Sequence, residues 1–216
     1  IDLMVVIIGV CTAFLIQNIA ADRKVEREKI KVFSALKMEL EDFRVVFPLF
    51  AEGNEGYLND LEEKDMRDIS YWRFVEPQYG YQIIEYCINT DNSEIIDFQL
   101  YEELQSLYVL IMQLELSERQ ITEVAGQYQY LIPEVDTNHP LNLERTANNQ
   151  SRFVRFKIFL ESRIGILKRT SENATEVLDR IHESLPPEEI TKINLKYSRN
   201  RITLIGSEEE SVSLLT

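Results

Sequence analysis

The chain opens with an apolar segment that is followed at once by a strongly charged one. Residues 3–21 are nineteen residues without a charge, and residues 22–31 carry eight charged side chains. At about 1.5 Å per residue, a helix over the apolar segment spans roughly 28 Å, close to the hydrocarbon thickness of a bilayer. A cleaved signal peptide fits less well, because Ile19 stands where a small residue is needed before the cleavage site. A buried core helix is the other alternative. The pattern favours a transmembrane helix at residues 1–21.

Beyond this segment, apolar residues recur three and four positions apart while charges occupy the other faces, which predicts amphipathic helices. One helix is expected to continue the membrane span as a rod that ends near Pro48. A more polar stretch at residues 52–68 either continues this helix or forms a loop, and a short helix follows over residues 77–89. Two long helices follow at 97–133, capped by Asp97, and at 149–184. The buried stripes are Phe33, Leu36, Leu40, Phe43 and Phe47; Leu100, Leu104, Leu107, Ile111, Leu114, Ile121, Val124, Tyr128 and Leu131; and Phe153, Phe156, Leu160, Ile164, Leu167, Ala174, Leu178 and Ile181.

These elements predict an all-α protein in which a single N-terminal transmembrane helix continues into an antiparallel helical bundle. The expected organisation is a transmembrane helix at 1–21, an acidic bundle domain at 22–190 and a C-terminal segment at 191–216. In that last segment Ile193, Leu195 and Tyr197 alternate with polar residues, which indicates a small hairpin or, equally, a disordered tail. The low counts of 7 glycines and 6 prolines disfavour a turn-rich sandwich or barrel.

Composition limits the partners and the chemistry. The net charge of −14 repels nucleic acid phosphates, so no nucleic acid partner is expected. Cys11 lies in the apolar segment and Cys87 in the soluble part, so the two cysteines provide no disulfide framework or metal site. Asp179 and His182 lie one turn apart, but no third ligand has a suitable spacing, and a surface ion pair is the preferred interpretation. We expect no metal, no cofactor and no catalytic residues.

An aromatic cluster falls between the first and second long helices. Interleaved aromatic residues sometimes stack on bases, but here only Arg73 accompanies them, so packing between helices is the preferred interpretation. The cluster consists of Tyr71, Trp72, Phe74, Tyr79, Tyr81 and Tyr86.

Three residues of the apolar segment are candidates for a function. An acidic side chain at the entrance of a span, such as Asp2, is able to carry protons, although an interfacial aspartate facing water is the preferred interpretation. Residues 1–6 resemble the start of the span in proton-driven stator proteins of the biopolymer-transport type, whereas the soluble part does not. Gly9 and Ala13 have the spacing of small residues that allows transmembrane helices to pack closely.

A wider resemblance covers about half of the chain. It is carried by residues 5–10, Ala13, residues 16–18, 23–24 and 36–40, and later by residues 81–82, Asn92, residues 95–97 and residues 100–108. These motifs are similar to those of a family of small single-pass proteins common in Bacteroidota, which have no established function. The chain departs from that family at Ile19, where an aromatic residue usually follows the asparagine.

The two indications of membrane orientation disagree. Five basic residues follow the span, namely Arg23, Lys24, Arg27, Lys29 and Lys31, and by the positive-inside rule they predict a cytoplasmic domain. The family resemblance instead implies an upstream basic segment and a domain outside the cytoplasm. We adopt an inner-membrane location with the domain in the periplasm as the expectation.

Three functional hypotheses follow. The preferred one is an accessory or structural subunit that docks its helical domain onto another membrane protein or onto a second copy of itself. The second is a sensor whose bundle binds a small molecule. The third is a proton-coupled motor subunit that uses Asp2.

Overall fold

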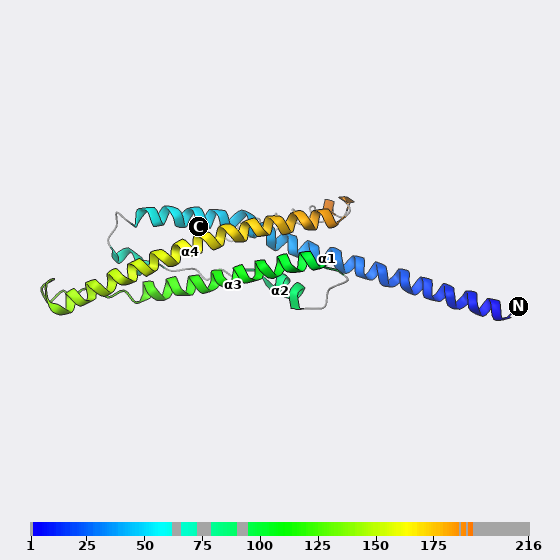
Figure 1. Ribbon diagram of the computed structural model, residues 1–216, viewed down its shortest axis with the longest axis horizontal. Coiled ribbons are helices and arrows are strands. Elements are labelled where there is room, and N and C mark those ends of the chain that lie inside the picture. The colour runs from blue at the N-terminus through cyan, green and yellow to red at the C-terminus, as the bar shows by residue number, and fades with distance from the viewer. Residues whose placement is uncertain are drawn as a thin grey trace, which may run out of the picture. The chain divides into compact units, whose positions relative to one another are not determined.

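The computed structural model describes residues 2–61, 66–72, 79–89, 95–185, 187–188 and 190–191, without the side chains of residues 2–16 and 66–68. In this part of the chain every regular element is helical, which confirms the predicted all-α class. In chain order the elements are α1 (Asp2–Asp60), the 3₁₀ helix η1 (Met66–Tyr71), α2 (Gln82–Asn89), α3 (Phe98–Gly126) and α4 (Pro140–Ser184) (Figure 1).

The chain divides into two compact units. Unit 1 contains Ile1–Glu39, Gln82–Leu104 and Val177–Thr216, and unit 2 contains Leu40–Tyr81 and Gln105–Glu176. All three boundaries within the long helices fall where the apolar stripes continue, so α1, α3 and α4 each supply core residues to both units.

Unit 1 is held together by the stripes that the sequence predicts. Burying a leucine, isoleucine or phenylalanine side chain contributes about 1.5–3 kcal/mol. At the start of α3 the Asp97 Oδ1 atom accepts a hydrogen bond of 2.8 Å from the Leu100 amide, which confirms Asp97 as the N-cap. The buried apolar residues are Val32, Phe33 and Leu36 from α1, Ile84 and Cys87 from α2, Leu100 and Leu104 from α3, and Val177, Leu178 and Ile181 from α4.

In unit 2 the contacts define the direction of each helix. Along α1 and α4, Arg44 meets Ser171 and Tyr57 meets Phe156, so these helices run antiparallel. Along α3 and α4, the pairs Ser106–Asn173 and Gln129–Asn149 show the same relation. Within unit 2, α1 and α3 therefore run in the same direction. The expected antiparallel order applies to α4 against each of the other two.

Part of the aromatic cluster has the packing role that the sequence indicates, whereas Tyr71 and Tyr86 are exposed. The Trp72 ring lies 4.7 Å from the Tyr57 ring and 5.5 Å from the Phe156 ring. The Tyr79 ring meets the Phe47 ring edge-on at 5.4 Å. Phe74 lies outside the described residues. These ring contacts attach the segment after α1 to the core of unit 2.

Helix α1 does not end at Pro48 but continues for twelve more residues to Asp60. Proline lacks an amide hydrogen, so the carbonyl of Arg44, four residues earlier, loses its helical partner. The Ser171 hydroxyl of α4 donates to this carbonyl at 3.2 Å. Ala51, in the turn after the proline, is 1% exposed. Tertiary packing and a substitute hydrogen bond thus carry the helix through a residue that usually ends one.

The connection between α3 and α4 also differs from the expectation. Helix α3 ends at Gly126, before Pro133, and α4 begins at Pro140, nine residues before Asn149. Proline is favoured in the first turn of a helix because its missing amide hydrogen has no helical partner there. His139 precedes it and accepts hydrogen bonds from the Leu143 amide at its carbonyl, 3.0 Å, and from the Leu141 amide at Nδ1, 3.3 Å.

The backbone of residues 3–21 belongs to α1. Among the side chains that the structure describes, no helical stretch is both long enough and apolar enough to cross a membrane. The side chains of Asp2, Gly9 and Ala13 lie outside the described residues, as do residues 192–216 with their predicted hairpin or tail.

A glycine inside α1 allows a test of how much local helix propensity contributes to the stability of the fold. Gly53 is exposed, and no atom lies within 4 Å of the position that a Cβ would take. Alanine is favoured over glycine in a helix interior, so Gly53→Ala should raise the free energy of unfolding by about 0.5–1 kcal/mol in urea titrations followed by circular dichroism. The reverse change at the buried Ala51, two positions earlier, should lower the free energy of unfolding. A loss of stability in Gly53→Ala would contradict the open helical environment.

Candidate functional site

The connection between α3 and α4 in unit 2 is fixed by the amide of Asn142. This residue is 1% exposed. Its Oδ1 atom accepts a hydrogen bond from the Ile132 amide at 2.8 Å, and its Nδ2 atom donates to the carbonyls of Ile132, Val135 and Asp136 at 3.2, 3.3 and 3.1 Å. A single side chain therefore replaces the backbone pairing that a loop of this length lacks.

Asn149, one heptad further along α4, repeats the arrangement on the other side of the loop. Its Oδ1 atom accepts from the Gln129 amide at 3.0 Å and its Nδ2 atom donates to the Gln129 carbonyl at 2.7 Å. Arg145 Nη1 donates to the Tyr130 carbonyl at 2.5 Å. The Tyr130 hydroxyl lies 3.2 Å from the Ser70 hydroxyl of η1. The loop is thus held at several consecutive backbone positions.

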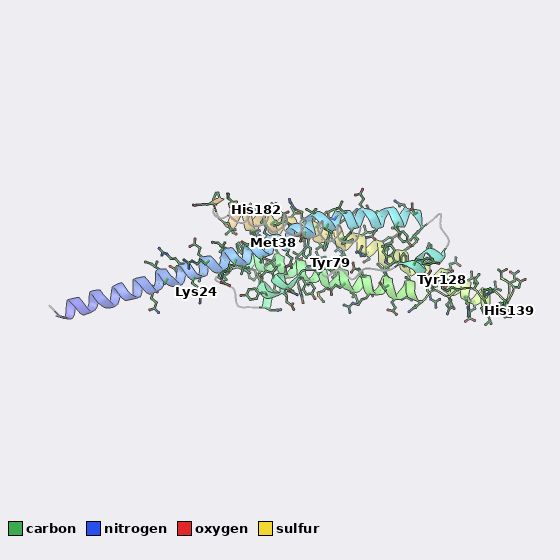
Figure 2. All side chains as sticks on the ribbon, turned by 180° about the vertical axis from the view of Figure 1, so that it is seen from behind. Lys24, Met38, Tyr79, Tyr128, His139 and His182 are labelled. Atoms are coloured by element: carbon green, nitrogen blue, oxygen red, sulfur yellow. The ribbon has the colours of Figure 1, made fainter. Side chains whose placement is uncertain are left out.

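This fixed loop and the first turn of α4 expose large apolar side chains to solvent. Tyr130, Leu131, Leu141 and Leu143 are 56%, 42%, 49% and 54% exposed. We call these four residues the loop surface. Leu141 and Leu143 stand on either side of Asn142 in the first turn of α4, and Leu131 precedes Ile132, whose backbone the Asn142 amide binds. Figure 2 shows this end of unit 2 between the labelled Tyr128 and His139.

Order and apolar exposure together are typical of a recognition surface. An ordered segment that exposes several large apolar groups offers them to a binding partner. A loop that is already ordered loses little conformational entropy when a partner binds, so more of the buried apolar area appears as affinity. The arrangement is suited to binding a protein rather than to chemistry, because its outward groups are aliphatic or phenolic.

A second feature of unit 2 is a buried ionic cluster formed by Tyr79, Glu118 and Arg163. The three residues are only 7%, 6% and 4% exposed. Arg163 of α4 donates from Nε and Nη2 to Oε1 of Glu118 on α3 at 2.9 and 2.7 Å. The Tyr79 hydroxyl donates to the same carboxylate oxygen. The cluster links both long helices to the segment that precedes α2.

Electrostatics keeps Tyr79 in its donor form. Burial, and then the hydrogen bond and negative charge of Glu118, raise the pKa of the Tyr79 hydroxyl, while Arg163 lowers it by less. The phenol therefore stays protonated well above the pH at which a free tyrosine ionises. Because three donors and one acceptor oxygen satisfy one another away from solvent, the cluster is suited to fixing helix register and not to proton transfer with a substrate.

His182, for which the sequence predicts an ion pair with Asp179, contacts a lysine in unit 1. His182 Nε2 lies 2.9 Å from Nζ of Lys37 on α1. A lysine ammonium has only donors, so Nε2 accepts and the neutral ring carries its hydrogen on Nδ1. Asp179 is exposed. In the described ranges no three histidine, cysteine, aspartate or glutamate side chains are arranged to hold a metal ion.

The loop surface and the ionic cluster were both missed by the sequence argument, although signals for each exist. Glu118 falls four residues after Leu114 and three before Ile121, which is a position on the apolar stripe of α3. Asn142, Asn149, Phe156 and Arg163 follow one another at intervals of seven along the inward face of α4. Polar residues at such positions indicate buried hydrogen bonding.

Comparisons of this chain with models of known protein families, with curated proteins and with solved structures found no match.

The ionic cluster should behave as one unit. Arg163→Met leaves the Glu118 carboxylate enclosed without its cation, so the free energy of unfolding should fall by about 3–5 kcal/mol in denaturant titrations. The triple variant Tyr79→Phe, Glu118→Leu, Arg163→Met replaces all the polar groups with apolar ones of similar size, and it should lie within about 2 kcal/mol of the wild type. Equal losses in the single and triple variants would mean that volume, and not charge pairing, sets the cost.

Cys87 on α2 should be an inert thiol in the folded protein. It is 1% exposed, and burial together with the nearby Glu39 carboxylate raises its pKa to about 12. The reactive thiolate is therefore scarce at pH 8, and Cys87 should react with Ellman's reagent at least about 100-fold more slowly than in guanidinium.

The measurement uses a Cys11→Ser variant so that only Cys87 reports. Between pH 7.5 and 9.5 the rate should rise in the unfolded chain and stay low in the folded one, because only the unfolded thiol ionises in this range. Labelling of the native protein at the unfolded rate would show that Cys87 is not buried in the core of unit 1.

Proposed function

We propose that this protein is a membrane-anchored accessory subunit that docks its helical domain onto another membrane protein through the loop surface. The observation that carries the proposal is the exposure of Tyr130 and Leu131 on a loop whose backbone Asn142 and Asn149 hold in place, and of Leu141 and Leu143 in the first turn of α4. Leaving four large apolar groups in water is unfavourable, so a partner that covers them gains about 25 cal/mol for each Å² of apolar area.

The anchor in this proposal is the uncharged segment at residues 3–21. Its length matches the hydrocarbon thickness of a bilayer, and the charged residues after it act as a stop-transfer signal. Its backbone is continuous with the rest of α1. We place it in the inner membrane as a single span, with the helical domain in the periplasm. Gly9 and Ala13 would then face a second span, from the partner or from another copy of the chain.

The role is non-catalytic. The polar groups that the fold encloses in unit 2, Tyr79, Glu118 and Arg163, satisfy one another, which supports a structural role for them. A sensor that binds a small molecule remains the second hypothesis and a motor subunit that uses Asp2 the third. The described contacts support neither as directly as they support docking.

The test replaces the loop surface without disturbing the residues that fix the loop. The full-length variant Leu131→Ser, Leu141→Ser, Leu143→Ser should keep the melting temperature within a few degrees and lose most of the protein that co-purifies after mild detergent extraction. Losing this apolar contact should weaken binding by at least about 10-fold, a hot-spot effect of 1–2 kcal/mol.

A matched control removes three equally exposed apolar groups from the helices of unit 2. Val109, Val154 and Ile158 are 48%, 52% and 54% exposed. Their triple serine variant should retain the wild-type assembly. If both variants retain it, docking does not use the loop surface. If the wild-type protein is extracted without any partner and as a monomer, the accessory-subunit proposal is wrong and ligand screening of the sensor hypothesis follows.

A further inference from the structure

Helix α1 carries a one-sided row of basic side chains next to the apolar segment. Arg23, Lys24, Arg27 and Lys31 are all exposed (Figure 2 labels Lys24). At 100° per residue they fall within an arc of about 100° on the helix surface. We call these four residues the basic face. The rest of the chain is strongly acidic, with a net charge of −14 overall.

The packing of unit 1 leaves the basic face uncovered. The apolar residues that enter the core, Val32, Phe33 and Leu36, are 4%, 1% and 0% exposed and point to the opposite side of α1. Lys29 belongs to that side too, with its Nζ atom 5.3 Å from the centre of the Phe33 ring. Of the five basic residues that follow the apolar segment, Lys29 therefore lies on the core side of α1. The other four form the basic face.

Acidic neighbours leave the basic face with a net positive charge. Asp22 and Glu26 lie outside the arc by helix geometry. Glu28 borders it and lies 3.5 Å from Lys31, where it offsets part of one charge. The first member, Arg23, follows the last uncharged residue of the apolar segment by two positions. All four charges then lie within about 15 Å of that segment along the axis, close to the range over which lipid headgroups attract cations.

We propose that the basic face binds anionic phospholipid headgroups of the membrane that α1 enters. The proposal rests on the anchor proposed above and adds a lipid preference to it. Phosphates of lipids such as phosphatidylglycerol meet the four side chains, whereas zwitterionic headgroups gain no net attraction. The binding holds α1 at a defined depth and rotation.

The experiment uses the full-length protein in proteoliposomes of phosphatidylcholine containing a trace of spin-labelled lipid. Electron paramagnetic resonance measures the fraction of lipid immobilised by the protein, for labelled phosphatidylglycerol and for labelled phosphatidylcholine. The ratio of the two association constants should be about threefold or more for the wild type at low salt and should fall towards 1 in 1 M NaCl. Lipid in both leaflets is observed, so the result does not depend on orientation.

Charge removal on the basic face should abolish this preference. The variant Arg23→Gln, Arg27→Gln, Lys31→Gln should bring the ratio close to 1. A control with the same loss of charge at exposed positions of unit 2, Arg119→Gln, Arg155→Gln, Arg169→Gln, should keep the wild-type ratio.

The outcomes separate the two proposals. A wild-type ratio near 1, or an unchanged ratio in the first variant, overturns the lipid preference and leaves the anchor in place, because immobilised lipid is still present. The absence of any immobilised lipid overturns the membrane anchor and the lipid preference together.

Discussion

A carboxylate at a buried position of α3 sets the constraint on which unit 2 depends. Glu118 occupies the apolar stripe, where an ion without a partner costs several kcal/mol, so α3 and α4 are stable only in the register that brings Arg163 against it. A slip of one turn along α4 would place Phe159 or Leu167 opposite the charge. The same register brings Asn149 to Gln129 and Asn142 to Ile132, pairs separated by 20 and 10 residues. The ordered loop and its exposed apolar residues thus depend on an ion pair that is buried within unit 2.

The sequence predicted the parts of the fold that depend on periodicity and failed where a distant residue decides a helix end. The stripes of α1, α3 and α4 and the Asp97 cap are local, because apolar spacing and capping act within a few residues. Pro48 was expected to end α1, but the hydroxyl that stabilises the Arg44 carbonyl comes from Ser171, 127 residues away. The end of α3 at Gly126 has a similar cause, since the backbone after it is bound by Asn149 of α4. Local rules contain no information about either partner.

The candidate site was less predictable than the fold for a related reason. The sequence indicated Asp2, Gly9 and Ala13, which are distinctive within an apolar segment, and their side chains lie outside the described residues. The residues that form the loop surface are leucines and a tyrosine, and Leu131 was assigned to the buried stripe of a longer helix. Because α3 stops early, that leucine lies on the surface instead. An apolar residue changes from the core to the exposed surface through the position of a helix end, which spacing alone does not determine.

The long sequence separation of the contacts made by α1 determines when the protein acquires its structure. The Arg44 carbonyl is bound by Ser171 within unit 2, and Lys37 is bound by His182 within unit 1. These partners are synthesised 127 and 145 residues later. At a synthesis rate of about 5–20 residues per second, the amphipathic part of α1 is exposed for roughly 6 to 30 s before α4 is complete. During this time the apolar face of α1 lacks the α4 residues against which it packs in the folded protein. Neither unit forms until nearly the whole chain has left the ribosome, so ribosome-bound truncations that lack the end of α4 resemble an unfolded protein with one preformed helix.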